Sequence, residues 1–120
     1  MMDKKQTLEM IAAISNANGA PGFEDEVVAA ILPYAKELGE TQVDRMRNLY
    51  IRRNGNTGAR PVVQLDGHSD EVGFMVQAIC PNGTLRIIPL GGWISCNVPA
   101  HTVWLRNRAG AYIPGHPARK

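Results

Sequence analysis

A run of strand-forming residues that ends in a cluster of polar side chains constrains this chain more than any other feature. Residues 61–65 are mostly apolar and include two adjacent valines, a pattern typical of a buried strand. Gly67 allows the backbone to turn, and His68 and Asp70 then fall at the carboxyl end of the predicted strand. Open α/β sheets place their ligands at that edge. The sequence therefore predicts an α/β fold with a candidate site here.

His68 and Asp70 form a His-x-Asp unit. Residues two apart in a strand share a face, so the carboxylate can fix the tautomer of the ring while the other ring nitrogen holds a divalent ion such as zinc or cobalt. The same spacing also suits a simple hydrogen-bonded surface pair. The neighbouring Asp66 and Glu71 fit either acceptors that support such a site or exposed turn charges.

The remaining candidate ligands and nucleophiles point to structural roles. A catalytic zinc needs three protein ligands and an open position. His101 alternates with apolar residues as a strand side chain does, and His116 lies between a glycine and a proline, as a solvated loop residue would. Cys80 and Cys96 lie at neither a predicted helix start nor a cationic cluster, so we expect reduced thiols used in packing.

Composition excludes several classes of protein. The chain has 120 residues, 44% of them hydrophobic and 20% charged, which indicates a globular protein of one domain's length. A net charge of +2, with basic residues scattered along the chain, does not favour nucleic acid as a partner. The first residues resemble neither a secretory signal nor a membrane span. We therefore expect a cytoplasmic protein without a membrane partner.

The order of predicted elements is helical first and then all-β. Thr7 is a candidate N-cap for a first helix that ends near Asn16, and acidic residues at 24–26 favour the start of a second helix through the helix dipole. Pro33 predicts a kink or break in that second helix, and Gly39 is its predicted C-cap. The predicted strands are residues 42–46, 48–53, 61–65, 74–79, 84–90, 98–107 and 111–113.

Several longer segments carry a family resemblance. GHSDEVGFMVQAI, NGTLRIIPLGGW and NVPAHTVWLRNRAGAYIPG, preceded by SNANGAPGFEDEV and VDRMRNLYIRR, resemble the tetrahedral, self-compartmentalising metalloaminopeptidases. Members of this family are also labelled glutamyl aminopeptidases or endoglucanases. The resemblance extends from about residue 8 to residue 115 and involves several motifs in the order of the family.

The resemblance implies a hydrolase with a co-catalytic pair of divalent metal ions, zinc or cobalt, that releases N-terminal residues from peptides and assembles as a homo-oligomer. His68 matches the first metal ligand of the family, and Asp70 matches the catalytic aspartate that orients that histidine. The other ligands and the general base of the family lie downstream of the matched region. Residues 1–70 would be the N-terminal part of the catalytic domain, and residues 71–120 an incomplete β-barrel inserted into it.

Three hypotheses follow. The first is an N-terminal fragment of such an aminopeptidase, with little or no activity as an isolated chain. The alternative is a non-catalytic interaction or assembly module that pairs through its β domain, because open strand edges are templates for pairing. The third is a small hydrolase with a single metal, held by His68 and Asp70 together with His101 or Glu71.

Overall fold

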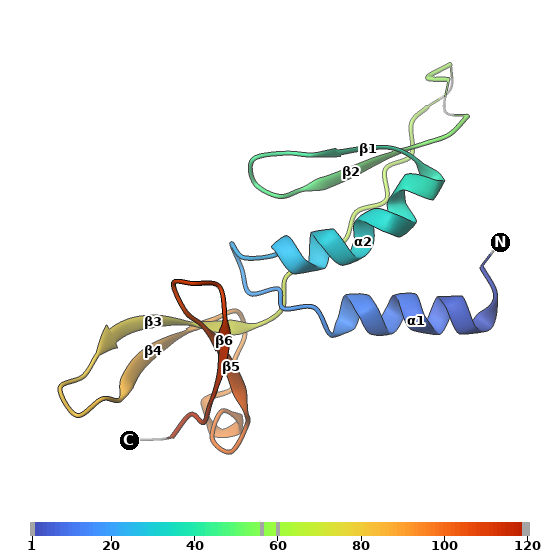
Figure 1. Ribbon diagram of the computed structural model, residues 1–120. Helices are drawn as coiled ribbons and strands as arrows, with labels where there is room; N and C mark the ends of the chain where they lie inside the picture. The colour runs from blue at the N-terminus through green and yellow to red at the C-terminus, as the bar shows by residue number, and fades with distance from the viewer. Residues whose placement is uncertain (1, 56, 60, 119–120) are drawn as a thin grey trace. The chain divides into compact units, whose positions relative to one another are not determined.

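The computed structural model describes residues 2–55, 57–59 and 61–118, which divide into two compact units, residues 1–73 and 74–120 (Figure 1). The first unit contains two helices and a two-stranded sheet, and the second contains two further two-stranded sheets. Mixed helices and antiparallel strands confirm the predicted α/β class. In order, the elements are α1 (Lys4–Ser15), α2 (Asp25–Leu38), β1 (Gly39–Val43), β2 (Leu49–Arg53), β3 (Gly73–Ile79), β4 (Leu85–Leu90), a short 3₁₀ helix (Ser95–Asn97), β5 (Val103–Arg106) and β6 (Tyr112–Gly115).

Helix α1 begins one turn earlier than the sequence predicts. Asp3 is the N-cap, and its carboxylate accepts the backbone N–H of Gln6 at 2.8 Å while the Gln6 side chain accepts the N–H of Asp3 at 2.9 Å. This reciprocal pair is a capping box, and it satisfies two N–H groups that the helix itself leaves unpaired. The prediction of Thr7 as the cap was therefore wrong. Its hydroxyl instead donates to the carbonyl oxygen of Asp3 within the helix.

Helix α2 supplies the core of the first unit. Its buried side chains are Val27, Val28 and Ala35, and it contacts both α1 and the β1–β2 hairpin. The helix continues without a break through Pro33, so the predicted break is not present. Proline lacks a backbone N–H and costs one helical hydrogen bond there, and burial of the apolar face on both sides of it maintains the helix. The predicted C-cap at Gly39 is confirmed.

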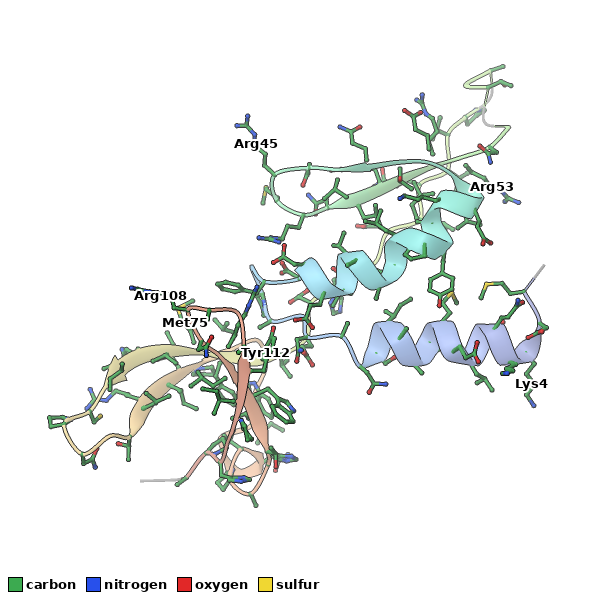
Figure 2. The ribbon with its side chains drawn as sticks, in the orientation of Figure 1. Lys4, Arg45, Arg53, Met75, Arg108 and Tyr112 are labelled. Atoms are coloured by element: carbon green, nitrogen blue, oxygen red, sulfur yellow. The ribbon has the colours of Figure 1, made fainter. Side chains whose placement is uncertain are left out.

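The β1–β2 hairpin packs against α2. Val43 pairs with Leu49 at the closed end of the hairpin, and the turn between them is built on Asp44, whose carboxylate accepts the N–H groups of Met46 and Asn48. The strands begin and end a few residues from their predicted bounds because this turn occupies residues 44–48. An ion pair between Arg47 and Asp25 of α2 joins the hairpin to the helix. Figure 2 shows the neighbouring Arg45 extending away from the hairpin tip.

Residues 61–72 form no strand in the structure, which corrects the prediction of a buried strand there. No strand is assigned in this segment, and the side chains of Val62, Val63 and Leu65 are 70%, 83% and 94% exposed. A strand exists through its ladder of hydrogen bonds to a neighbour, and none of the described strands lies in register beside this segment. The local pattern therefore predicted a buried strand where the structure has an exposed segment without strand pairing.

The second unit consists of two hairpins. Strands β3 and β4 pair around the turn at Pro81, where the Cys80 N–H donates to the Thr84 carbonyl oxygen, and β5 pairs antiparallel with β6. The predicted turns of both hairpins are confirmed, with shorter strands in the second. The rings of Phe74 and Trp93 stack with centroids 4.9 Å apart. Among the described residues, the sheets of this unit are the pairs β3–β4 and β5–β6.

The turn at Asp44 makes the first unit sensitive to acid. Hydrogen bonds, chiefly from the Asn48 side chain, hold the pKa of Asp44 below its ordinary value of 3.8. Because the folded state binds the proton less tightly, the stabilisation is complete above the ordinary pKa and disappears as the pH falls through the lowered one. A titration of the Asp44 carboxyl carbon by NMR should show the lowered pKa. In Asn48→Ala the pKa should move back toward 3.8, and an unchanged pKa would show that this hydrogen bond is not its main cause.

Two valines allow burial to be tested with the same substitution. Val27→Ala should lower the free energy of unfolding by about 2 kcal/mol, because Val27 is 4% exposed and its truncation leaves a cavity. Val62→Ala should change it by less than about 0.5 kcal/mol. Urea unfolding followed by circular dichroism measures both. An equal cost at the two positions would mean that residues 61–65 are covered in solution.

Candidate functional site

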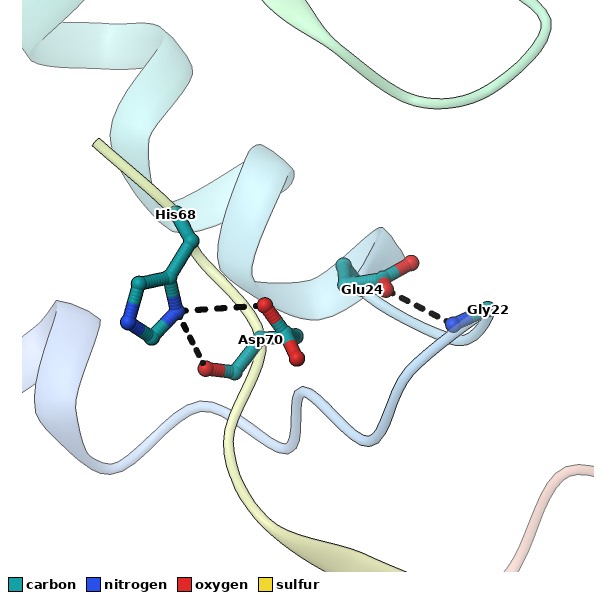
Figure 3. Close-up of polar contacts among 4 residues, drawn as sticks. All are labelled: Gly22, Glu24, His68 and Asp70. Carbon is teal, nitrogen blue, oxygen red and sulfur yellow. Dashed lines mark hydrogen bonds and ion pairs between the residues drawn. The ribbon is translucent and has the colours of Figure 1, made fainter. Parts of the chain in front are cut away.

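His68 and Asp70 lie close together on the extended segment that leads into β3. The ring nitrogen Nδ1 of His68 is 3.1 Å from the Oδ1 atom of Asp70 and also 3.1 Å from the backbone carbonyl oxygen of the same residue (Figure 3). The structure therefore brings the two predicted site residues together without a strand. The contact is local, because the ring of His68 lies beside Asp70, only two positions along the chain (Figure 3).

This geometry decides which ring nitrogen carries the proton. A backbone carbonyl oxygen accepts hydrogen bonds only, and an ionised carboxylate does the same. Nδ1 of His68 faces one of each, so it must be the donor to both. In the neutral ring Nε2 then carries the lone pair. The pair thus presents an imidazole nitrogen that is ready to bind a Lewis acid or accept a proton.

The lone pair of His68 is accessible. The side chain is 85% exposed, compared with 41% for Asp70, and Figure 3 shows Nε2 on the side of the ring away from the carboxylate. Nε2 makes no hydrogen bond to any residue within the described ranges. A ligand from outside these residues can therefore reach it without displacing an existing contact.

Two hydrogen bonds attach the segment that carries His68 to the loop after α1. The backbone N–H of Glu71 donates to the carbonyl oxygen of Gly19 at 2.8 Å. In return, the N–H of Gly19 donates to the Oε1 atom of Glu71 at 3.1 Å. The carboxylate of Glu71 is therefore an acceptor for a backbone group, and its predicted role in supporting a metal site stays a prediction. For Asp66 the structure shows no contact that would distinguish its two predicted roles.

Gly19 is buried at this junction, and its lack of a side chain is required. A Cβ atom at Gly19 would lie 2.6 Å from a methyl carbon of Val27 and 3.3 Å from the carbonyl oxygen of Ser69. The next residue, Ala20, is also close to this segment, because a Cβ atom at Gly73 would lie 3.3 Å from the Cβ atom of Ala20. The loop after α1 and the segment between His68 and β3 therefore lie against each other closely at two successive points.

The acidic residues at 24–26 do not form a paired carboxylate site. Each binds a different partner, as expected for consecutive residues at a helix start, and Asp25 and Glu26 lie in the first turn of α2. The partners are the backbone N–H of Gly22 for Glu24 (Figure 3), Arg47 for Asp25 and Asn18 for Glu26.

The other candidate ligands add nothing to the pair. His101 and His116 are exposed, and the thiol of Cys96 donates to the side chain of Asn97. Across residues 2–55, 57–59 and 61–118, no three His, Cys, Asp or Glu side chains lie close enough to hold a metal ion together. The hypothesis of a complete single-metal site built from His68, Asp70 and a third residue of this chain therefore has no support.

Sequence reasoning missed one residue of this region, Gly19. It lies three residues beyond the predicted end of the first helix, and no local pattern indicates that it contacts a residue 52 positions later. The signal that could have drawn attention to it is a glycine flanked by small residues before the turn at Pro21, since close backbone approach requires glycine.

Comparison with known proteins places this geometry in a family. Residues 47–118 match the family of M42 glutamyl aminopeptidases. The glutamyl aminopeptidase of Lactococcus lactis subsp. cremoris is 30% identical over 110 residues, which cover 91% of this chain and 31% of that protein. The protein FrvX of Escherichia coli is 34% identical over 109 residues, covering 90% of this chain and 30% of FrvX.

A solved structure agrees with the sequence matches. The crystal structure of the TET aminopeptidase from a marine sediment archaeon of the Thaumarchaeota superposes with a TM-score of 0.85 at 33% identity, covering 93% of this chain and 31% of that one. The chain thus spans about 30% of the length of the curated relatives that it matches. Among the described residues, no helix has the length and apolar character needed to cross a bilayer. By family match, sequence identity and fold, the chain belongs to the M42 glutamyl aminopeptidase family.

Proposed function

We propose that this chain contributes the His68–Asp70 part of a metal centre in an aminopeptidase that removes N-terminal residues from peptides. Family membership supports the reaction class. The observation that carries the assignment to residues is the position of His68 Nδ1 between two acceptors of Asp70, which leaves Nε2 as an exposed lone-pair donor.

The donor chemistry of this pair fits a divalent metal. Neutral imidazole is a common ligand of zinc and related ions, and a metal-binding histidine usually donates its other ring N–H to a carboxylate or a carbonyl. In His68 this N–H, on Nδ1, donates to both the carboxylate and the carbonyl oxygen of Asp70. When bound, such a metal supplies Lewis-acid activation of the peptide carbonyl. A catalytic zinc takes three protein ligands, and the His68–Asp70 pair supplies one of them, Nε2 of His68.

The complete centre therefore requires ligands from elsewhere. We propose two divalent ions, zinc or cobalt, whose other ligands and general base lie in the part of the family proteins that this chain does not match. The chain matches 31% of the L. lactis enzyme, so about two-thirds of that protein is available to supply them. On this proposal the 120 residues alone hold an incomplete centre and hydrolyse peptides poorly.

Asp70 acts through the ring of His68. Its carboxylate accepts from Nδ1 of His68 at 3.1 Å, which holds the ring proton on Nδ1 and leaves Nε2 as the ligand atom. Asp70 is 41% exposed, so its carboxylate is partly in contact with solvent. Its role in the proposed reaction is to orient and polarise the ligand.

A second function, assembly through the β unit, is favoured by a specific observation. Trp104 is 59% exposed, and its register partner on β6 is the exposed Pro114, so the two lie on the same face of the β5–β6 sheet. Large apolar side chains beside open strand edges are typical of an association surface. We propose that this surface pairs with a second copy of the chain or with a family member.

A cytoplasmic location and the assignment of the two units to a catalytic domain and an inserted barrel remain predictions from the sequence.

The metal proposal is tested by adding Zn²⁺ to the ¹⁵N-labelled chain and recording histidine ring nitrogens by NMR. Before addition, His68 should carry its proton on Nδ1. Zinc should then shift Nε2 of His68 first, because that nitrogen is exposed and oriented. Asp70→Ala should weaken the binding by about 10- to 100-fold, the usual effect of removing the acceptor behind a ligand histidine.

His101→Ala and His116→Ala serve as the controls, since both residues are exposed and neither is part of the pair. Each should leave the zinc response of His68 unchanged. A ring of His68 protonated on Nε2, or zinc shifts of equal size at all three histidines, would contradict the proposed site.

The assembly proposal is tested by size-exclusion chromatography with light scattering. The chain should have a mass above that of a monomer, and Trp104→Lys should lower it by placing a charge in the proposed surface. Val62→Lys, at an exposed valine of the other unit, is the matched control and should leave the mass unchanged. A monodisperse wild-type monomer would argue against this function.

A further inference from the structure

Both ends of the peptide group between Asp70 and Glu71 are occupied by hydrogen bonds. Its carbonyl oxygen, which belongs to Asp70, accepts from Nδ1 of His68 at 3.1 Å. Its N–H, which belongs to Glu71, donates to the carbonyl oxygen of Gly19 at 2.8 Å. The described chain contains no cis peptide bonds, so this group is planar with its C=O and N–H pointing in opposite directions. Fixing one end of the plane therefore fixes the direction of the other.

The Gly19 end of this plane is held from several sides. The N–H of Gly19 donates to the carboxylate of Glu71, so both the N–H and the carbonyl oxygen of Gly19 are hydrogen-bonded to Glu71. The preceding Asn18 donates its side-chain amide to Glu26 at the start of α2 at 2.8 Å. Any Cβ at Gly19 would overlap Val27, one of the few buried side chains. The acceptor for the Glu71 N–H is thus anchored to the core of the first unit.

We propose that Gly19 and Glu71 are positioning residues for His68, acting through the plane of the Asp70–Glu71 peptide. Gly19 orients this plane so that the Asp70 carbonyl faces Nδ1, and the Glu71 carboxylate holds Gly19 in place. The role of this arrangement in metal binding rests on the function proposed above. Its role in setting the tautomer of His68 does not.

The effect on the ring follows from the direction of the dipoles. Two hydrogen bonds in series connect Gly19 with His68. The carbonyl oxygen of Gly19 accepts from the N–H of the Asp70–Glu71 peptide, and the carbonyl oxygen of the same peptide accepts from Nδ1 of His68. Such chains polarise one another, so each bond strengthens the next. If the plane rotates, Nδ1 loses one of its two acceptors and keeps only the Asp70 carboxylate. The preference for the proton on Nδ1 then falls without disappearing.

Two substitutions loosen this link in different ways, and each has a matched control. Glu71→Ala removes the acceptor of the Gly19 N–H. Its control is Asp66→Ala, which removes an exposed carboxylate on the other side of His68 in the sequence. Gly19→Ala forces the loop away from Val27, whereas a Cβ at Gly67 meets nothing within 4 Å, so Gly67→Ala is its control. Glu71→Gln keeps an oxygen at the same reach and serves as the rescue variant.

Three readouts on the full 120-residue chain test the proposal. Hydrogen exchange of the Gly19 and Glu71 amides reports the link itself, and long-range ¹H–¹⁵N spectra of the metal-free protein report the tautomer of His68. Glu71→Ala and Gly19→Ala should speed exchange, raise the Nε2-protonated fraction of His68 and weaken zinc binding about 10-fold. Glu71→Gln and the two controls should retain wild-type values for all three.

The result that overturns the proposal is faster exchange at Gly19 and Glu71 in the test variants with an unchanged His68 tautomer, because the link would then only hold the loop. Should Gly19→Ala fail to fold, Glu71→Ala compared with Glu71→Gln gives the same decision. Failure of the metal proposal is distinguishable. A wild-type chain that binds no zinc at His68 contradicts that proposal, while the tautomer of the metal-free variants still decides whether Gly19 and Glu71 position the ring.

Discussion

The paired hydrogen bonds between Gly19 and Glu71 join parts of the chain that are 52 residues apart. Closing a flexible loop of that length costs roughly 3.5 kcal/mol in chain entropy, and two hydrogen bonds return about 0.5–1.5 kcal/mol each. The bonds alone therefore do not close the loop. The closure relies on the ordered elements between these residues, chiefly α2 and the hairpin packed on it, which remove most of the freedom that a flexible loop would lose. The position of His68 thus depends on the packing of α2.

How much of this could be read from the sequence differs between local and distant features. The α/β class, the second helix with its Gly39 cap and the turns of the β hairpins all depend on nearby residues, and they were predicted. The contact between His68 and Asp70 is also local, because it spans two residues. The Asp3 cap was missed because Thr7 offers an equally suitable hydroxyl. The partner of Gly19 could not be predicted, since nothing near Gly19 in the sequence indicates a contact as distant as Glu71.

The segment at 61–65 shows where a correct local pattern leads to a wrong environment. Its adjacent valines have the composition of a strand covered on both faces, yet both side chains are largely exposed. The family relatives are about three times as long as the matched region, and such a strand needs neighbours that a sequence pattern cannot supply by itself. Few side chains of the first unit are buried for the same reason, so its stability rests on a small core around Val27.

Proteases preferentially cut exposed segments that lie outside regular secondary structure. Residues 61–66 are exposed and form no strand, and only Gly67 separates them from His68. A cut there would leave α1, α2 and the first hairpin on one piece and His68 on the other. Gly19 and Glu71 would then be on different polypeptides, held together by their hydrogen bonds and by the close approach of Gly19 to Ser69 and of Ala20 to Gly73. The molecule would behave as a two-chain complex whose integrity depends on concentration.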